Sequence, residues 1–356
     1  MTADRSGSGG AVSGEAASGE AAFGTAAPGE AVPGEAVSGT AASGEAASGG
    51  AGPGSRTALV VGGAGFVGRH AAAALAGGGF RVLTLGRAPR PGALRADLAA
   101  TAPGELAALL DRHRVDLVVN AAGAVWGGLD EETVHRANVT LVRTLVEAVA
   151  VSARAPRLVQ LGSGYEYGPT PEGASVTEDA PARPTTPYGR TKLLATRTVL
   201  AAAEEGRIDG VVLRVASALG PGAPAGSLFG ALLERLRAAP AGGPPAEIVL
   251  RPLVSRQDFV DVRDVGAAVC RAATAAPGAA RLLNIGGGRA VPVRDLVRHL
   301  VGLSGAPVRI TERDDGTGAR GGGLDWQLLD TAAARAAWGW TPARGPENAL
   351  HDLWHH

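Results

Sequence analysis

The 356-residue chain has a single cysteine, Cys270, so it can form no disulfide within itself. Acidic and basic residues are balanced at 34 each, which argues against a surface built to bind nucleic acid or an anionic membrane. The seven histidines form no cluster with metal-ligand spacing, and no long apolar run suits a membrane span. These absences predict a cytoplasmic protein without metal, nucleic-acid or membrane partners.

The beginning of the chain lacks the residues that a folded core needs. Residues 11–50 repeat as eight pentads with glycine at every fifth position, and Phe23 is their one aromatic residue. A segment so poor in large apolar side chains cannot offset the entropy of ordering its backbone. We therefore predict a disordered pentad-repeat tail over residues 1–55.

A glycine-rich motif opens the remainder of the chain. The apolar run Thr57–Val61 reads as a strand, and it leads through Gly62-Gly-Ala-Gly-Phe-Val-Gly68 into a helical pattern. Gly62 and Gly65 permit a tight turn and close backbone approach, and Gly68 permits close helix–sheet packing. A helix start offers free N–H donors to an anion. The motif predicts binding of a dinucleotide pyrophosphate.

A second motif carries groups suited to proton transfer. Tyr188 and Lys192 are four residues apart and so share a helix face, where the ammonium is expected to lower the pKa of the phenol from its usual value near about 10. Ser163, which ends a predicted strand, could hydrogen-bond the substrate oxygen. We predict these three residues as the catalytic group.

Strand-like and helix-like stretches alternate from residue 57 onward, which predicts an α/β protein with a Rossmann-type, doubly wound parallel sheet. After Gly222 the pattern becomes irregular, which predicts a smaller, interleaved C-terminal substrate lobe. The expected division is a dinucleotide-binding domain at 56–219 with a return segment at 256–290, and a substrate lobe at 220–255 and 291–356. The strands are expected at 57–61, 81–85, 115–119, 157–161, 210–214 and 282–285, and the helices at 66–77, 103–112, 131–151 and 187–205.

Together these motifs resemble the extended branch of the short-chain dehydrogenase/reductase superfamily, also described as the NAD-dependent epimerase/dehydratase family. The resemblance implies a homodimer through the long helices at 131–151 and 187–205. It also implies that Asp97 and Leu98 lie near the adenine. The full set of expected cofactor contacts is Gly62, Gly65, Phe66, Val67, Gly68, Arg87, Asp97, Leu98, Ala122, Gly123, Tyr188 and Lys192.

The end of the second strand indicates which cofactor is preferred. Enzymes that use the unphosphorylated cofactor usually place a carboxylate there, whereas this chain has Arg87. A guanidinium suits a 2′-phosphate. The sequence therefore favours NADP(H), with NAD(H) as the other possibility.

The reaction type follows from a departure within the family. Its 4,6-dehydratases carry Asp-Glu directly after the position of Ser163, and this chain has Gly164-Tyr165. The chain is similar instead to NDP-hexose 4-ketoreductases of deoxysugar and antibiotic biosynthesis, which implies NADPH-dependent reduction of an NDP-4-keto-6-deoxyhexose. A nucleotide-sugar epimerase and a non-catalytic dinucleotide-binding sensor stay as alternatives. The expected substrate contacts are Trp126, Ser163, Arg256 and Arg320.

Overall fold

The computed structural model describes residues 55–124, 130–239, 245–314 and 324–356. The repeat tail predicted at residues 1–55 lies outside these ranges except for its last residue.

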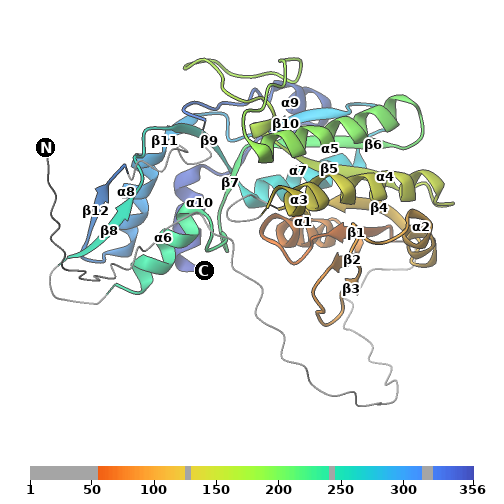
Figure 1. Ribbon diagram of the computed structural model, residues 1–356, viewed down its shortest axis with the longest axis horizontal. Coiled ribbons are helices and arrows are strands. Elements are labelled where there is room, and N and C mark those ends of the chain that lie inside the picture. Colours follow the sequence, from red (N-terminus) through yellow and green to blue (C-terminus); the bar gives the residue numbers. More distant parts are fainter. Residues whose placement is uncertain (1–54, 125–129, 240–244, 315–323) are drawn as a thin grey trace, which may run out of the picture.

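A seven-stranded parallel sheet forms the centre of the larger part of the molecule, in the strand order β10-β6-β5-β4-β1-β2-β3 (Figure 1). All five residues of β1 are buried, because Ala58 and Val60 face one helix layer while Leu59 and Val61 face the other. Burial on both faces explains why apolar and polar residues do not alternate along β1. The seven strands are β1 (Thr57–Val61), β2 (Arg81–Gly86), β3 (Leu94–Arg95), β4 (Val115–Asn120), β5 (Arg157–Ser163), β6 (Gly210–Val215) and β10 (Leu282–Ile285).

Helices cover both faces of this sheet. α1 and α7 pack together on one face, and α2, α4 and α5 cover the other. This arrangement confirms the predicted doubly wound α/β fold. The helices are α1 (Phe66–Gly77), α2 (Pro103–Arg112), α4 (Leu141–Val151), α5 (Pro187–Glu204) and α7 (Val262–Thr274).

The helix expected at 131–151 is interrupted. A π-helical turn (Arg136–Thr140) separates the short α3 (Glu131–His135) from α4. Within this turn the buried Asn138 accepts a hydrogen bond from the Ala124 N–H at 2.9 Å and donates to Thr191 Oγ1 in α5 at 3.0 Å. The wider turn places the amide between the loop after β4 and helix α5, a tertiary role that the local sequence pattern does not reveal.

A second group of elements has its own core. A three-stranded sheet in the order β11-β9-β7 and a parallel pair of β12 with β8 pack with α6, α8 and α10. Strand β10 lies between these elements in the sequence but joins the edge of the larger sheet beside β6, so the smaller lobe is interleaved as predicted. The exact domain boundaries stay predictions. These elements are β7 (Ser217–Leu219), β8 (Ala246–Leu250), β9 (Arg256–Asp261), β11 (Ala290–Pro292), β12 (Val308–Glu312), α6 (Leu228–Arg237), α8 (Val293–Ser304) and α10 (Pro346–His355). Helix α9 (Ala332–Trp338) instead packs beside β10 of the larger sheet.

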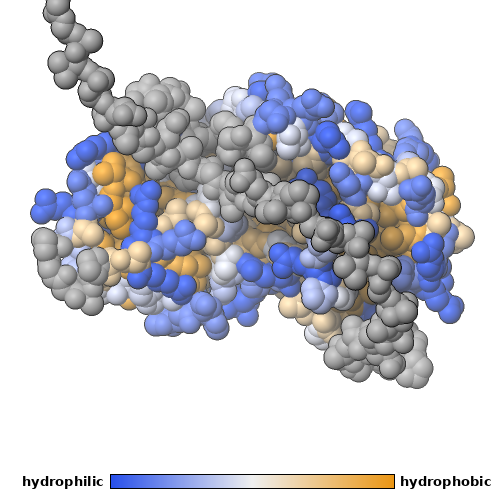
Figure 2. Space-filling model, turned by 60° about the horizontal axis from the view of Figure 1, so that its bottom comes forward, coloured by the Kyte–Doolittle hydropathy of each residue, from blue (hydrophilic) through white to orange (hydrophobic). Residues whose placement is uncertain are grey.

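Hydrophilic and hydrophobic residues are mixed over the coloured part of the face in Figure 2, as expected for a chain with balanced charge. Within the described ranges, no helix is both long and apolar enough to span a membrane, and no group of three or more potential ligands could hold a metal ion. The homodimer through α4 and α5 stays a prediction.

Candidate active site

The glycine turn between β1 and α1 leaves no room for side chains. Gly62 has φ +74°, a conformation that favours glycine, and a Cβ on it would lie 2.8 Å from Ala122 Cα. A Cβ on Gly68 would lie 2.1 Å from the Gly62 carbonyl oxygen. These contacts hold the turn tightly between the sheet and the helix.

Helix α1 begins directly at this turn, with Phe66 and Val67 in its first turn. Its N-cap residue, Gly65, has no side chain to occupy the N–H groups of the first turn, and the first turn contains no acidic residue. The helix start therefore presents donors and the positive end of its dipole, the features that a pyrophosphate needs. The residues present fit a dinucleotide cofactor.

The segment after β4 forms the neighbouring wall. Ala122 lies against Gly62, and a Cβ on Gly123 would be 2.8 Å from the side-chain oxygen of Asn138. The structure thus brings Ala122 to the glycine turn and Gly123 to Asn138, and their contact with a cofactor stays a prediction. Trp126, the predicted sugar contact, lies outside the described residues.

Ser163, Tyr188 and Lys192 come together at the carboxyl end of the sheet. Ser163 ends β5, while Tyr188 and Lys192 lie in the first two turns of α5, whose start is capped by Thr186 through a 3.0 Å bond from the Gly189 N–H. The Ser163 hydroxyl and the Tyr188 phenol are hydrogen-bonded to each other. The buried Lys192 ammonium donates to the Leu161 carbonyl in β5. Three residues from two elements therefore converge.

The pKa of Tyr188 moves in the direction opposite to our prediction. Burial raises it to about 12, and the negative charge of Glu166 adds to this rise, while the hydrogen bond from Ser163 lowers it only in part. Burial also lowers the pKa of Lys192 to about 8, against the opposing effect of Glu166. The expectation that Lys192 lowers the phenol pKa is wrong here, because burial raises that pKa and the ammonium, bound to the Leu161 carbonyl, has no opposing effect on it. A protonated phenol suits a proton donor.

A buried ionic network beneath these residues was missed by the sequence analysis. Glu166 is fully buried and its carboxylate accepts hydrogen bonds from the Ser163 N–H at 2.8 Å, Thr196 Oγ1 at 3.0 Å and Arg214 Nε at 2.8 Å. Arg214 also lies 4.5 Å from the centre of the Tyr167 ring. The one sequence feature that could have indicated this network is Arg214, a charged residue within the otherwise apolar strand β6. The network fixes the backbone that carries Ser163.

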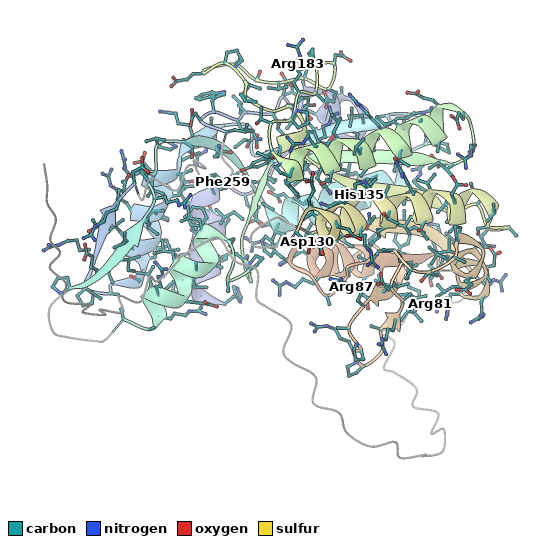
Figure 3. The ribbon with its side chains drawn as sticks, in the orientation of Figure 1. Arg81, Arg87, Asp130, His135, Arg183 and Phe259 are labelled. Atoms are coloured by element: carbon teal, nitrogen blue, oxygen red, sulfur yellow. The ribbon has the colours of Figure 1, made fainter. Side chains whose placement is uncertain are left out.

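The residues expected near the adenosine end lie along the β2–β3 side of the sheet. Arg87 follows β2 directly and its side chain is exposed (Figure 3). Asp97 is also exposed, 3.8 Å from a nitrogen of Arg136. The side chain of Leu98 is buried in the core, so only its backbone could contact a cofactor.

Of the two arginines expected to contact the substrate, the structure describes only Arg256. Arg256 is exposed on β9 and its guanidinium lies 5.9 Å from the centre of the Trp326 ring. The next residue, Gln257, is buried and donates to the Leu324 carbonyl. Arg320 lies outside the described residues.

Comparison with known proteins gives consistent matches. The NAD dependent epimerase/dehydratase family matches residues 58–286. The dTDP-6-deoxy-L-talose 4-dehydrogenase (NAD(P)(+)) of Kitasatospora kifunensis is 46% identical over 302 residues, covering 83% of this chain and 93% of that protein. The UDP-glucose 4-epimerase of Azospirillum brasilense is 29% identical over 319 residues, covering 80% and 86%. The solved structure of MoeE5 in complex with UDP-glucose and NAD is 30% identical with a TM-score of 0.70, covering 84% of this chain and 97% of that one.

Proposed function

This chain belongs to the NAD-dependent epimerase/dehydratase family and is an NAD(P)-dependent oxidoreductase of the extended short-chain type, and on that premise we propose that it is an NADPH-dependent 4-ketoreductase of a dTDP-4-keto-6-deoxyhexose. The observation that carries this proposal is that Ser163, Tyr188 and Lys192 gather at the carboxyl end of β5, on the same edge of the parallel sheet as the glycine turn that follows β1. That arrangement can deliver a proton next to a bound dinucleotide.

The proposed mechanism assigns one task to each of these residues. A nicotinamide cofactor, held at the glycine turn by the N–H groups at the start of α1, would supply a hydride for C4 of the sugar. Tyr188 donates its phenolic proton to the C4 oxygen, and its raised pKa keeps that proton available at neutral pH. Ser163 donates a hydrogen bond to the same oxygen and fixes its position. Lys192 would hold the nicotinamide ribose.

The substrate assignment draws on the relative from Kitasatospora kifunensis. Its name places dehydrogenation at C4 of dTDP-6-deoxy-L-talose. Oxidation of that hydroxyl and reduction of the corresponding ketone are the two directions of one hydride transfer. Gly164 and Tyr165 stand where the dehydratases carry acidic residues, which supports hydride transfer without loss of water.

An assay with the two substrates of this equilibrium tests the proposal. The purified protein should consume NADPH in equal amount to added dTDP-4-keto-6-deoxy-L-mannose, and should reduce NADP⁺ when given dTDP-6-deoxy-L-talose. Conversion of a nucleotide sugar without net cofactor consumption would favour the epimerase alternative, which the similarity to the UDP-glucose 4-epimerase supports. Cofactor binding without any conversion would favour the sensor.

We propose that Arg87 selects the phosphorylated cofactor. The Arg87→Asp variant should raise KM for NADPH by about 10- to 100-fold, because it replaces a charge-assisted contact with a repulsion, and should leave KM for NADH nearly unchanged. Arg81→Asp is a matched control. Arg81 is the first residue of β2, whereas Arg87 follows the last residue of β2, so the two arginines lie at opposite ends of that strand (Figure 3). Equal shifts for both nucleotides in Arg87→Asp would contradict this role.

A further inference from the structure

Two buried glutamine side chains, Gln327 beside Gly164 and Gln257 on β9, have polar atoms without hydrogen-bond partners among the described residues. Gln327 is 2% exposed, and neither its Nε2 nor its Oε1 has a hydrogen-bond partner among the described residues. Gln257 is 5% exposed, and its Oε1 is unpaired in the same sense. A buried amide without partners costs free energy, so its presence calls for a specific reason.

The Gln327 amide lies directly against the residue that follows Ser163. A Cβ on Gly164 would be 2.9 Å from Gln327 Nε2 and 3.0 Å from Oε1. Glycine at position 164 is therefore what gives the amide its place beside the catalytic group. An acidic residue there, as in the dehydratases, would occupy the same space.

The backbone that carries Gln327 is held firmly in position. Its N–H donates to the Arg256 carbonyl at 3.0 Å, the Leu329 N–H donates to Asp258 Oδ2 at 3.1 Å, and the Asp330 N–H donates to the Val176 carbonyl at 2.9 Å. Asp258 in turn accepts a bond from the Gly287 N–H at 2.7 Å. These bonds tie the segment to β9 on one side and to the chain around Val176 on the other. The amide is thus positioned before any ligand arrives.

Gln257 takes the adjacent place on the same face. Arg256 and Trp326 are paired in parallel register, with the guanidinium over the indole, so the next residues of both strands project to the opposite face. Gln257 uses its Nε2 to donate to the Leu324 carbonyl, which leaves its Oε1 as an acceptor. The two glutamines together offer one donor group and two acceptors.

We propose that Gln327, with Gln257 beside it, binds the 2- and 3-hydroxyl groups of the hexose, on the C3 side of the carbon that is reduced. The inference rests on the proposed function and names a specificity site for it. A pair of sugar hydroxyls both donates and accepts, and so matches an amide on both of its atoms. A phosphate has only acceptor oxygens and would leave both glutamine carbonyls unpaired. The unpaired glutamine atoms, one amide donor group and two carbonyl acceptors, therefore match the sugar ring better than the diphosphate.

The variant Gln327→Leu tests this site. It should raise KM for the dTDP-4-keto sugar by about 5- to 30-fold, the effect of losing one or two hydrogen bonds, while KM for NADPH stays unchanged. The thermal midpoint should stay the same or rise, because no protein partner is lost. Gln160→Leu is the control for stability, since Gln160 is buried and bonded to Asn120 at 2.8 Å. That variant should lower the midpoint.

A substrate analogue separates hydroxyl binding from a structural role. A dTDP-hexose that lacks the 2- or 3-hydroxyl should bind the unaltered enzyme about 5- to 30-fold more weakly, and Gln327→Leu should show no further loss for one of the two analogues. A variant that binds both the full sugar and the analogues like the unaltered enzyme would overturn the inference. If calorimetry shows binding of a dTDP-hexose and the assay shows no reduction of its ketone, the reductase proposal fails. The affinity of Gln327→Leu for that dTDP-hexose then still tests whether Gln327 binds the sugar hydroxyls. Binding of no nucleotide sugar overturns both.

Discussion

Replacing Tyr188 by phenylalanine is expected to lower kcat by about 10²- to 10⁴-fold, because the variant keeps the ring but loses the proton that the reduction requires. The hydrogen bond to Ser163 is lost as well. Removal of a buried phenol hydroxyl should not weaken the glycine turn, so KM for NADPH should change little. Steady-state kinetics with the keto sugar and a direct titration of NADPH measure the two effects separately.

Tyr167→Phe is the matched control among the three tyrosines of the chain. The Tyr167 hydroxyl donates to Asn284 Oδ1 at 2.7 Å and takes no part in the proposed chemistry. Its removal should lower the free energy of unfolding by about 1 kcal/mol and leave kcat within a small factor. Comparable kcat values in Tyr188→Phe and the unaltered enzyme would refute the assigned proton donor.

Arg214→Met is expected to lower the free energy of unfolding by about 3–5 kcal/mol, because it leaves the fully buried carboxylate of Glu166 without its ionic partner. Glu166 also accepts from the Ser163 N–H, so the loss should reach kcat through a displaced serine. Denaturant unfolding followed by circular dichroism gives the free energy, and turnover measured well below the transition gives the second effect.

The double variant Glu166→Leu/Arg214→Met should recover much of this stability, since no charge is left buried alone. Arg207→Met provides the comparison at the surface. Arg207 forms an ion pair with Glu147 at the surface, where both side chains are about half exposed. Removing the Arg207 guanidinium should lower the free energy of unfolding by less than about 1 kcal/mol. Similar losses from Arg207→Met and Arg214→Met would contradict a special role for the buried pair.

Local patterns were sufficient to predict the frame of this molecule. The glycine motif needs only its own strand and helix, and the helix spacing of Tyr188 and Lys192 places both on one face of α5, so these features follow from neighbours in sequence. The parallel sheet follows from alternating strands and helices. Local periodicity failed where a tertiary contact intervened, as in the π-helical turn that holds Asn138 against Thr191.

The energetics of the site could not be predicted in the same way. The fall expected in the pKa of Tyr188 assumed that a nearby charge outweighs burial, and burial depends on elements distant in sequence. Likewise, Gln327 meets Gly164 only because β9 aligns the segment that carries it. A glutamine in a C-terminal stretch gives no sign of such a contact.

The return of β10 to the edge of the larger sheet has a consequence for biosynthesis of the protein. Its hydrogen-bonding partner, β6, leaves the ribosome well before it, because the residues between them form β7, α6, β8, β9 and α7. Until then β6 presents an open edge to the crowded surroundings of the nascent chain. The two halves of the enzyme therefore cannot mature one after the other, and a fragment that stops before residue 282 would be prone to aggregate.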